Sequence, residues 1–306
     1  MHSIKEITTD ILIIGAGAAG LSVYYGAKKA GSRALICDER EYAGGILPQC
    51  IHEGFGLGYF GENLTGPGYL NEYMRKLPQK GLENDLLLKT TALSVTKDRT
   101  ALLSNETGLI RVHFRKLAVC TGCREKTFYS LICTGERPQG IYTAGEAQEL
   151  INIRKKDIGQ VIVILGSGDI GQIMARRFTL LGKRVAAVIE QKDRLGGLLR
   201  NRRDCIDAFN IPVMLNSTVT EIHGYPDLRG VTVKNSVTGT EDHIPCDTLV
   251  TGMGLIPDKD IAADLLDNGR YPDWVFFSGN ASHVHEIVDA VTKEGEALGA
   301  SLANEY

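Results

Sequence analysis

The clearest hydrophobic pattern in the chain is a four-residue apolar run, Ile11–Ile14, that ends at a glycine-rich loop. Consecutive β-formers of this length predict a strand that is buried on both faces of a parallel sheet. The residues after the loop follow a helical period to about Ala30, and Gly31 provides a helix stop. A second apolar run at 33–37 predicts the next strand. The order indicates a β-α-β unit.

The loop contains a GxGxxG pattern at Gly15, Gly17 and Gly20. In such a loop the first glycine allows the tight turn, the second lets backbone N–H groups approach a pyrophosphate, and the third lets helix and strand pack closely. Asp38 follows the second strand, 23 residues after Gly15, where a carboxylate can accept a hydrogen bond from a ribose. The pattern therefore predicts a dinucleotide site at the N-terminus of a helix.

The same pattern occurs again in the second half of the chain. Its parts are the apolar run Val161–Leu165, the glycines Gly166, Gly168 and Gly171, and Glu190, which stands 24 residues after the first of them. The likeness continues beyond the acids, because the pair Gly44-Gly45 aligns with Gly196-Gly197 at an offset of 152. A single GxGxxG is weak evidence for a dinucleotide site. Here the glycine loop, the acid and the glycine pair occur twice in the same order, which predicts two dinucleotide-binding domains.

Alternating apolar residues predict an antiparallel β-meander after each of these units. The expected strands are 86–95, 100–103 and 109–114 in the first half, and 213–222, 230–234 and 242–245 in the second. Each meander leads into a buried strand that ends at Thr-Gly, first at Thr121-Gly122 and then at Thr251-Gly252. A helix is expected at 67–77. A final strand at 274–280 and a helix from about His283 to Leu302 are expected to return to the first domain.

Composition narrows the functional classes. The chain has 306 residues, a net charge of −3 and a pI of about 6.2, which argues against nucleic acid or an anionic membrane as the main partner. Neither a secretory h-region nor a stretch of about 18 apolar residues is visible. Seven scattered cysteines do not form a disulfide framework. We therefore expect a cytoplasmic protein without a membrane span.

On these motifs the chain resembles flavoproteins with two dinucleotide-binding domains, the glutathione-reductase and thioredoxin-reductase-like superfamily of pyridine nucleotide-disulfide oxidoreductases. Narrower similarity is carried by the segments 44–52, 122–125, 168–171, 196–201 and 279–285. These segments resemble the short FAD/NAD oxidoreductase that accompanies glycerol-3-phosphate dehydrogenase. They are also similar to the nucleotide-binding subunits of sarcosine, hydroxyproline and opine dehydrogenases.

The resemblance implies an α/β fold of two Rossmann-like three-layer domains, each with a β-meander. The FAD domain would comprise 1–152 and 247–306, the inserted NAD(P)H domain 153–246, and the crossings near Gly145 and Gly252 would act as hinges. The residues implied to bind FAD are Gly15, Gly17, Ala18, Ala19, Gly20, Asp38, Glu39, Gly45, Ile46, Ala92, Thr121, Gly122, Gly279, Asn280 and Val288. Those implied to bind NADH are Gly166, Gly168, Asp169, Ile170, Glu190 and Gly252.

One residue departs from the pattern of the superfamily. The usual late Gly-Asp is Gly279-Asn280 here, so an amide replaces a carboxylate. An Asn oxygen still accepts from a ribityl hydroxyl, so FAD binding is still expected.

The resemblance implies hydride transfer from nicotinamide C4 to flavin N5, and then electron passage to an acceptor. Glu190 should accept from the ribose hydroxyls and repel a 2′-phosphate, so we predict NADH in preference to NADPH. A following basic cluster could instead hold a phosphate, although a solvated helix face is the simpler interpretation of Lys192, Arg194, Arg200, Arg202 and Arg203.

Cysteines distinguish the branches of the superfamily. Cys50 lies where the glutathione-reductase branch places its redox pair, but no second cysteine follows closely. The thioredoxin-reductase branch carries CxxC shortly before the second glycine loop, where 141–160 contains none. Cys120 and Cys123 form a literal CxxC, but Thr121-Gly122 between them serves as the strand-ending turn, so we predict that the spacing is fortuitous.

Two catalytic candidates remain, Cys50 and His285. His283 and His285 are expected in the first turn of the last helix, which in this superfamily points toward the flavin. There a histidine could stabilise reduced flavin or donate a proton, or it could simply cap the helix. His52 and Cys50 could line the same face or be structural. No metal site is predicted, and no cysteine cluster has iron–sulfur spacing.

Three functions follow as hypotheses. The first is an NADH-linked FAD oxidoreductase that is a component of a larger dehydrogenase. The second is a thioredoxin-reductase-like disulfide reductase, and the third is a non-catalytic nucleotide-binding scaffold. The partners that stay open are a small-molecule or protein electron acceptor, a second copy of the chain in an oligomer, and a dehydrogenase partner subunit.

Overall fold

The computed structural model describes residues 4–304, and the chain divides into two compact units. Unit 1 runs to Arg124 and resumes at Ile256, whereas unit 2 comprises Glu125–Leu255. The two connections contain β11 (Cys123–Glu125) and β21 (Leu255–Pro257), which pair as a two-stranded sheet. No helix in the described part of the chain is long and apolar enough to cross a membrane.

A five-stranded parallel sheet forms the centre of unit 1. Its order is β22 (Val275–Phe277), β10 (Lys116–Val119), β2 (Ile11–Ile14), β3 (Ala34–Cys37) and β6 (Leu86–Leu87). All four residues of β2 are buried, because helices cover one face of the sheet and a meander covers the other. The pairing of β22 with β10 confirms that the last strand returns to the first domain.

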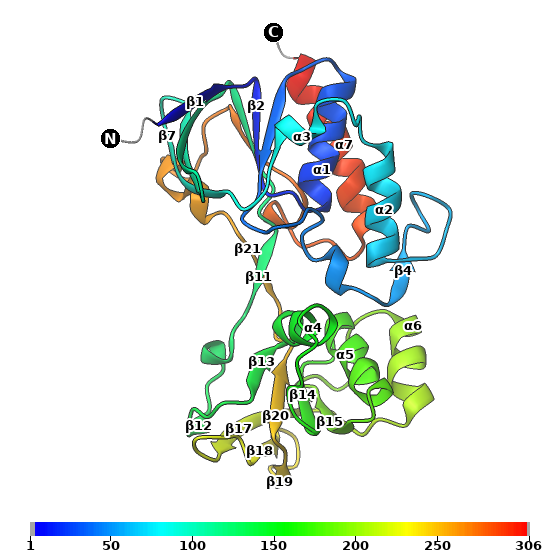
Figure 1. The fold of residues 1–306 in the computed structure, drawn as a ribbon. Helices are drawn as coiled ribbons and strands as arrows, with labels where there is room; N and C mark the ends of the chain where they lie inside the picture. The colour runs from blue at the N-terminus through cyan, green and yellow to red at the C-terminus, as the bar shows by residue number, and fades with distance from the viewer. Residues whose placement is uncertain (1–3, 305–306) are drawn as a thin grey trace. The chain divides into compact units, whose positions relative to one another are not determined.

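Three helices gather on one face of this sheet, namely α1 (Ala18–Lys29), α2 (Gly66–Lys76) and α7 (Val288–Asn304) (Figure 1). Glycines let α1 and α7 touch through their backbones. A Cβ on Gly26 would lie 2.2 Å from the carbonyl oxygen of Glu296, and one on Gly299 would lie 2.0 Å from that of Val23. The return of the C-terminal helix to the first helix therefore requires glycine at both positions.

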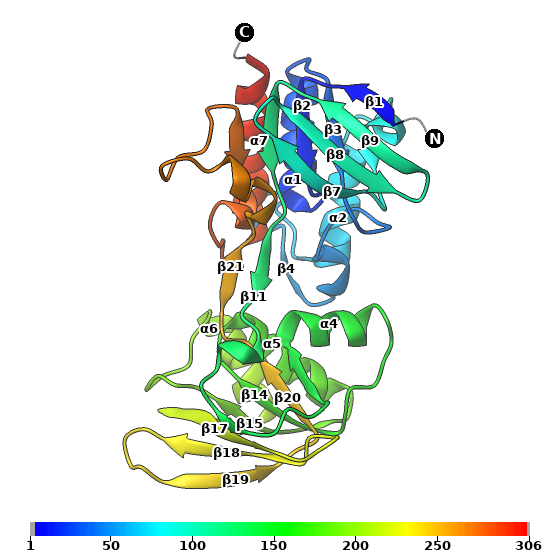
Figure 2. The ribbon, with the colours of Figure 1, turned by 90° about the vertical axis from the view of Figure 1, so that its left-hand side faces the viewer.

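The opposite face carries the meander of β7 (Thr91–Thr96), β8 (Thr100–Asn105) and β9 (Gly108–His113) (Figure 2). β1 (Lys5–Thr8), which the sequence did not predict, extends it by pairing in parallel with β9. The shorter elements of unit 1 are α3 (Leu82–Asp85), β4 (Glu53–Phe55), β5 (Leu64–Thr65) and the 3₁₀ turns Leu47–Gln49, Asp260–Leu265 and Gly279–Ala281.

Unit 2 repeats this architecture. Its parallel sheet has the order β13 (Ile141–Thr143), β20 (Thr248–Thr251), β14 (Val161–Leu165), β15 (Arg184–Ile189) and β16 (Val213–Met214). The helical layer contains α4 (Ala144–Asn152), α5 (Asp169–Leu180) and the α6 segment Leu199–Asn201, which continues through a π-helical turn, Arg202–Ile206, and a 3₁₀ turn, Asp207–Phe209. The second sheet consists of β12 (Thr134–Gly135), β17 (Ser217–His223), β18 (Gly230–Asn235) and β19 (Glu241–Pro245), and a 3₁₀ turn, Phe128–Ser130, precedes it. Two three-layer α/β units confirm the predicted fold class.

The unit boundaries differ from the predicted domain boundaries. Both predicted junctions, 152/153 and 246/247, fall inside unit 2. The physical reason is that β13 pairs with β20, and α4 packs in the same core, so 125–152 belong with the second sheet. Gly145 is accordingly a residue of α4, and its backbone N–H donates to the Glu125 carboxylate at 2.9 Å. The first crossing between the units lies at Glu125, 20 residues earlier than predicted.

A polar cluster joins α2 to α7 in unit 1. The Glu296 carboxylate accepts hydrogen bonds from the Tyr73 hydroxyl and from Lys76 Nζ, each at 2.8 Å, and a further one from Tyr59. The Lys76 ammonium also lies 4.6 Å from the centre of the Tyr59 ring. Burial alone would raise the pKa of Glu296, but these hydrogen bonds and the charge of Lys76 hold that pKa below its ordinary value.

Candidate functional site

The glycine loop of unit 1 is tightly packed at its first and third glycines. Gly15 has a φ of +103°, and a Cβ there would lie 2.4 Å from the Cys120 carbonyl oxygen. A Cβ on Gly20 would lie 1.8 Å from the Gly15 carbonyl oxygen. Backbone atoms cannot yield at either position, so both must be glycine for the turn and for the docking of α1 on β2.

Gly17 differs, because a Cβ there would meet only the Cα of Gly45, at 3.8 Å. Gly17 is also the N-cap of α1, which has neither a side-chain cap nor an acid in its first turn, where Ala18 and Ala19 stand. An uncapped helix N-terminus beside an open glycine suits a close-approaching anion. Gly45, with a φ of +58°, borders this opening. These residues fit the pyrophosphate of a dinucleotide.

Asp38 is fixed at the edge of the same loop. One oxygen of its carboxylate accepts from the backbone N–H of Ala16 at 2.6 Å, and the other accepts from that of Arg40 at 2.9 Å. A carboxylate has about four acceptor sites, so capacity for a ribose hydroxyl remains. The neighbouring Glu39 is exposed. Asp38 is therefore held beside the glycine loop with acceptor capacity to spare, as the predicted ribose contact requires.

The remaining residues predicted for FAD come from several segments of unit 1. Ile46 is 58% exposed, Ala92 is half-buried in β7, and Val288 begins α7. The Thr121 hydroxyl donates to the Asp258 carbonyl oxygen at 2.6 Å, and Gly122 has a φ of +80° at the strand-ending turn. Their role in FAD binding stays a prediction.

Asn280 closes a loop that the sequence predicted as helix. Its Oδ1 accepts from the backbone N–H of His285 at 2.9 Å, and a side chain that satisfies backbone groups in this way competes with helix formation. α7 begins only at Val288. The expectation that His283 and His285 occupy the first turn of the last helix is therefore wrong. Gly279, with a φ of +61°, precedes this loop.

Glu294, which the sequence did not single out, completes the environment of His285. Nε2 of His285 lies 2.8 Å from Oε2 of Glu294, and Oε1 of Glu294 accepts from the backbone N–H of Gly279 at 3.0 Å. The His285 side chain is only 8% exposed. Eight residues separate the two in the sequence, a spacing that matches no local motif, so only the folded chain reveals this contact.

Two cysteines of unit 1, Cys50 and Cys120, are poorly suited to nucleophilic roles. Cys50 is buried, and burial raises the pKa of its thiol to about 12. Cys120 is also buried, and burial followed by the charge of Glu294 raises the pKa of its thiol further. Cys123 is half-buried, and its Sγ lies 3.7 Å from Nδ2 of Asn280. A thiolate, the reactive form, is disfavoured at Cys50 and Cys120.

The glycine loop of unit 2 has the same construction. Gly166 has a φ of +105°, and a Cβ there would lie 2.3 Å from the Gly252 carbonyl oxygen. A Cβ on Gly171 would lie 2.2 Å from the Gly166 carbonyl oxygen. Gly168 again differs, because a Cβ there would meet no atom within 4 Å. The middle glycine thus leaves a space that a phosphate group can approach.

Glu190 occupies the position that corresponds to Asp38. Oε2 accepts from the backbone N–H of Ser167 at 3.1 Å and from the Ser167 hydroxyl, and Oε1 accepts from the backbone N–H of Lys192 at 2.9 Å. Burial alone would raise the pKa of Glu190, but these hydrogen bonds outweigh it and hold the pKa below its ordinary value. The group is therefore an anion at neutral pH.

Asp169 distinguishes the second loop from the first. It is the first residue of α5, and its Oδ1 accepts from the backbone N–H of Leu198 at 2.7 Å and from Nδ2 of Asn201 at 2.6 Å. It fastens the segment after Gly197 to the loop. Ile170, predicted with Asp169 to contact the nucleotide, is half-buried in the first turn of α5.

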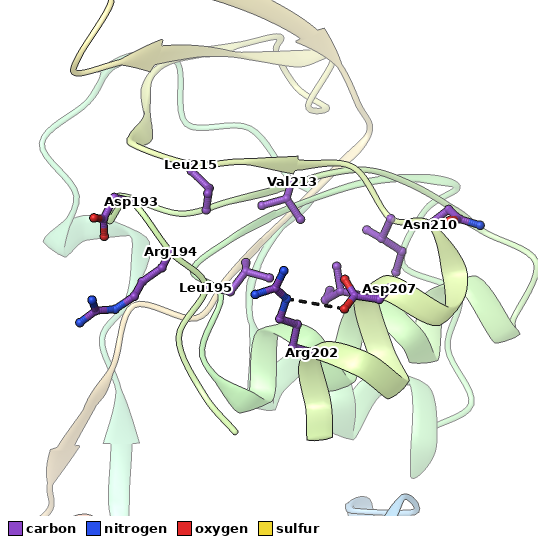
Figure 3. Close-up of a pocket in the computed structure, with 10 residues that line it drawn as sticks. Asp193, Arg194, Leu195, Arg202, Asp207, Asn210, Val213 and Leu215 are labelled. Carbon is purple, nitrogen blue, oxygen red and sulfur yellow. Dashed lines mark ion pairs between the residues drawn. The ribbon is translucent and has the colours of Figure 1, made fainter. Parts of the chain in front are cut away.

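A cavity of about 440 Å³ lies beside the strand that neighbours Glu190 (Figure 3). Leu215 and Val213 line it. Between them in the sequence is Met214, whose carbonyl oxygen accepts from the backbone N–H of Glu190 at 2.9 Å. Arg202 on the cavity wall pairs with Asp207 at 3.6 Å, whereas Arg194 points in a different direction (Figure 3). The wall therefore offers apolar surface together with two arginines, of which Arg202 is paired with Asp207.

Comparison with known proteins extends this picture. Residues 9–270 match the family described as pyridine nucleotide-disulphide oxidoreductase. Thioredoxin reductase of Mycolicibacterium smegmatis is 23% identical over 321 residues, which cover 98% of this chain and 96% of the relative. A subunit of the opine oxidase of Rhizobium meliloti is 26% identical over 183 residues, which cover 59% of this chain and 38% of the relative.

Solved structures show the same fold. T. acidophilum thioredoxin reductase superposes with a TM-score of 0.75 at 21% identity, covering 97% of this chain and 98% of that one. L-proline dehydrogenase from P. horikoshii superposes with a TM-score of 0.68 at 18% identity, covering 99% of this chain and 56% of that one. With the doubled glycine loops, these matches show that the chain belongs to the pyridine nucleotide-disulphide oxidoreductase family and is an FAD-dependent NAD(P)H oxidoreductase.

Proposed function

We propose that the protein oxidises NADH and passes the electrons through FAD to a separate acceptor, as a component of a larger dehydrogenase. Unit 1 would hold FAD at Gly17 and Asp38, and unit 2 would hold NADH at Gly168 and Glu190. The observation that carries the proposal is the doubled construction: both units have an open middle glycine and a fixed carboxylate after the next strand. The bound cofactors supply the hydride chemistry, and the chain binds and orients them.

The preference for NADH rests on Glu190. Its carboxylate is held by Ser167 and Lys192 at the place where the adenosine ribose is expected, so a 2′-phosphate would meet a negative charge. The basic residues after Glu190 favour a 2′-phosphate instead. The charge of Lys192 acts on Glu190 and helps to lower its pKa, and Arg202 pairs with Asp207. We infer that repulsion of a 2′-phosphate by Glu190 is the stronger effect.

Replacement of this acid tests the preference. We expect Glu190→Gln to lower the ratio of kcat/KM for NADH to kcat/KM for NADPH by about 10-fold or more, because roughly 1.4 kcal/mol of discrimination is lost. Steady-state kinetics with an artificial acceptor measure both values. Asp193→Asn, a charge change on the wall of the neighbouring cavity, is the matched control and should leave the ratio within about 2-fold. A wild-type enzyme that uses NADPH as well as NADH would overturn the assignment.

The role as a component is supported by relatives that are themselves parts of larger oxidases. The opine oxidase relative matches 59% of this chain, and the alpha chain of sarcosine oxidase of Corynebacterium sp. is 26% identical over 182 residues. This chain spans only 38% and 18% of those relatives. NADH turnover with an artificial acceptor separates an electron-transfer component from a non-catalytic scaffold, because a scaffold would bind nucleotide without turning it over.

Disulfide reduction is the second candidate, because thioredoxin reductases match nearly the whole chain. The interval 141–160 contains no cysteine, and burial disfavours the Cys120 thiolate of the sole CxxC pair. We therefore expect the number of titratable thiols to be the same before and after anaerobic reduction by NADH. Two additional thiols per chain after reduction would favour the disulfide reductase.

A further inference from the structure

Three side chains of the types that ligate metal ions lie close together in unit 1. Two are on the loop before α7 and one is on α7 itself. His283, His285 and Glu294 each offer one donor atom, and these atoms lie within 4.8 Å of one another. The two imidazole rings lie 4.1 Å apart at 34°. In the described part of the chain no other group of three such residues is this close.

Contacts to Asn280 and Glu294 fix the orientation of the His285 ring. Asn280 holds a fixed orientation, because its Oδ1 accepts from the His285 backbone N–H at 2.9 Å and its Nδ2 faces Cys123 Sγ. Nδ1 of His285 lies 3.3 Å from that oxygen, and Nε2 lies 2.8 Å from the Glu294 carboxylate. Both ring nitrogens thus face groups that only accept. Nε2 of His285 and Oε2 of Glu294 therefore face each other at one point, and the donor atom of His283 lies within 4.8 Å of both.

The donors suit a metal ion because three of them converge, two imidazole nitrogens and one carboxylate oxygen. Zinc accepts two imidazole nitrogens and one carboxylate oxygen at about 2.0–2.2 Å, which separates the donors by about 3.4 Å in tetrahedral geometry. The present separations bracket that value, so side-chain adjustments of about 1 Å are sufficient.

The surroundings also have the features of a second coordination shell. A ligating histidine normally donates its other N–H to a carbonyl or carboxylate, which is the contact between Nδ1 of His285 and Asn280. A ligating carboxylate is normally fixed by further hydrogen bonds, and Oε1 of Glu294 accepts from the Gly279 backbone at 3.0 Å and from the Ser278 hydroxyl at 3.3 Å. These contacts hold two ligands in fixed orientations.

We propose that His283, His285 and Glu294 bind a divalent transition-metal ion of the zinc class, with an open fourth position. The nitrogen-rich donor set selects Zn²⁺ over Mg²⁺, which prefers oxygen ligands in octahedral geometry. The proposal does not depend on the identity of the electron acceptor or on the choice between NADH and NADPH.

The test uses the full-length, flavin-loaded protein without a histidine tag, stripped with a chelator and titrated with Zn²⁺ by calorimetry. We expect one Zn²⁺ per chain and no comparable binding of Mg²⁺. His283→Ala is the principal variant, because His283 is exposed and its removal leaves the contacts among Asn280, His285 and Glu294 intact. Its affinity should fall by about 100-fold or more, since loss of an outer-shell partner alone costs about 10–100-fold.

His243→Ala is the matched control, because His223 and His243 form a second histidine pair with ring centres 4.9 Å apart. It should leave Zn²⁺ affinity unchanged. Flavin content and circular dichroism, measured on each variant, separate loss of the metal site from loss of flavin or of fold. Failure of the wild-type protein to bind Zn²⁺ would overturn the proposal, as would unchanged affinity in His283→Ala, which would indicate adventitious surface binding only.

Discussion

At the residue scale, the two glycine loops separate positions that serve the fold from positions that serve a ligand. Gly15 and Gly166 both adopt a positive φ, and a Cβ on either would clash with the carbonyl oxygen of the residue that follows a neighbouring strand. The folded backbone therefore requires glycine at both positions, whether or not a ligand is bound. Gly17 and Gly168 have room for a Cβ, so the folded chain alone does not require glycine there. The space at the middle glycine is therefore the feature that points to a bound pyrophosphate.

Gly168→Ala tests this distinction. Gly168 has a φ of −63°, which alanine adopts without strain, and the new Cβ meets no protein atom within 4 Å. We expect the free energy of unfolding to change by no more than about 1 kcal/mol. The KM for NADH should rise about 10-fold or more, equivalent to about 1.4 kcal/mol, because the methyl group occupies the approach of the pyrophosphate.

Flavin content provides the control for this variant, because the loop of unit 1 is unchanged and should remain loaded. Urea unfolding and steady-state kinetics give the two required values. An unchanged KM would remove Gly168 from the nucleotide site, whereas a large loss of stability would show that the glycine is structural after all.

At the element scale, α7 organises unit 1. It packs on α1 through Gly295 and Gly299, and its Asp289 carboxylate accepts from the backbone N–H groups of Gly56, at 3.1 Å, and Gly58, at 2.7 Å. Glu296 binds Tyr73 and Lys76 of α2. One C-terminal helix therefore holds the first helix, the loop after the Gly-Gly pair, and α2.

Glu296→Gln should destabilise unit 1 by about 1–3 kcal/mol, because charge-assisted hydrogen bonds are lost and buried partners remain. Equilibrium unfolding in urea measures the change. Arg75→Ala is the control, since Arg75 pairs with Glu72 at the surface, with 75% and 40% of the two side chains exposed. An exposed pair of this kind contributes at most about 0.5 kcal/mol. Equal effects of the two substitutions would contradict the assigned role of Glu296.

The same carboxylate predicts the direction of the acid dependence. The native pKa of Glu296 lies below its ordinary value, so the unfolded chain binds more protons than the native chain as the pH falls. The free energy of unfolding should therefore decrease as the pH falls from the ordinary glutamate value, about 4.3, through the native pKa. Glu296→Gln should show a smaller decrease over that range, and an identical pH dependence would exclude this contribution.

The elements with a clear hydrophobic pattern were predicted from the sequence. Those that depend on tertiary contacts were missed. The runs Ile11–Ile14 and Val161–Leu165 became central strands as expected, because burial on both faces leaves a continuous apolar signal. β1 was missed because Lys5–Thr8 is short, mostly polar and defined only by its partner β9. The start of α7 was placed too early because the Asn280 side chain redirects the backbone at His285.

The candidate site shows the same division. The glycines and the two acids were predicted from spacing alone, since a dinucleotide loop has a fixed length. Glu294 and the cavity at Leu215 were not, because each depends on segments that the fold brings together. Sequence spacing cannot report such contacts.

At the scale of the whole molecule, the chain contains two units with the same α/β architecture. Both units have a five-stranded parallel sheet, a helix that starts at a glycine loop, and a second sheet. The acids nevertheless differ, Asp38 in unit 1 and Glu190 in unit 2. Of the two helices that follow the glycine loops, α5 has an acid in its first turn, Asp169, and α1 has none. Two copies that have diverged in this way suit two different dinucleotides, which is the central claim of the proposed function.

An anaerobic titration of the purified, flavin-loaded protein with NADH, followed by the absorbance of oxidised flavin, tests that claim most directly. If unit 1 binds FAD and unit 2 binds NADH, the flavin should bleach rapidly and completely at one NADH per flavin. Yellow protein that does not bleach would contradict a functional NADH site in unit 2, and protein that binds no flavin would contradict the assignment of FAD to unit 1.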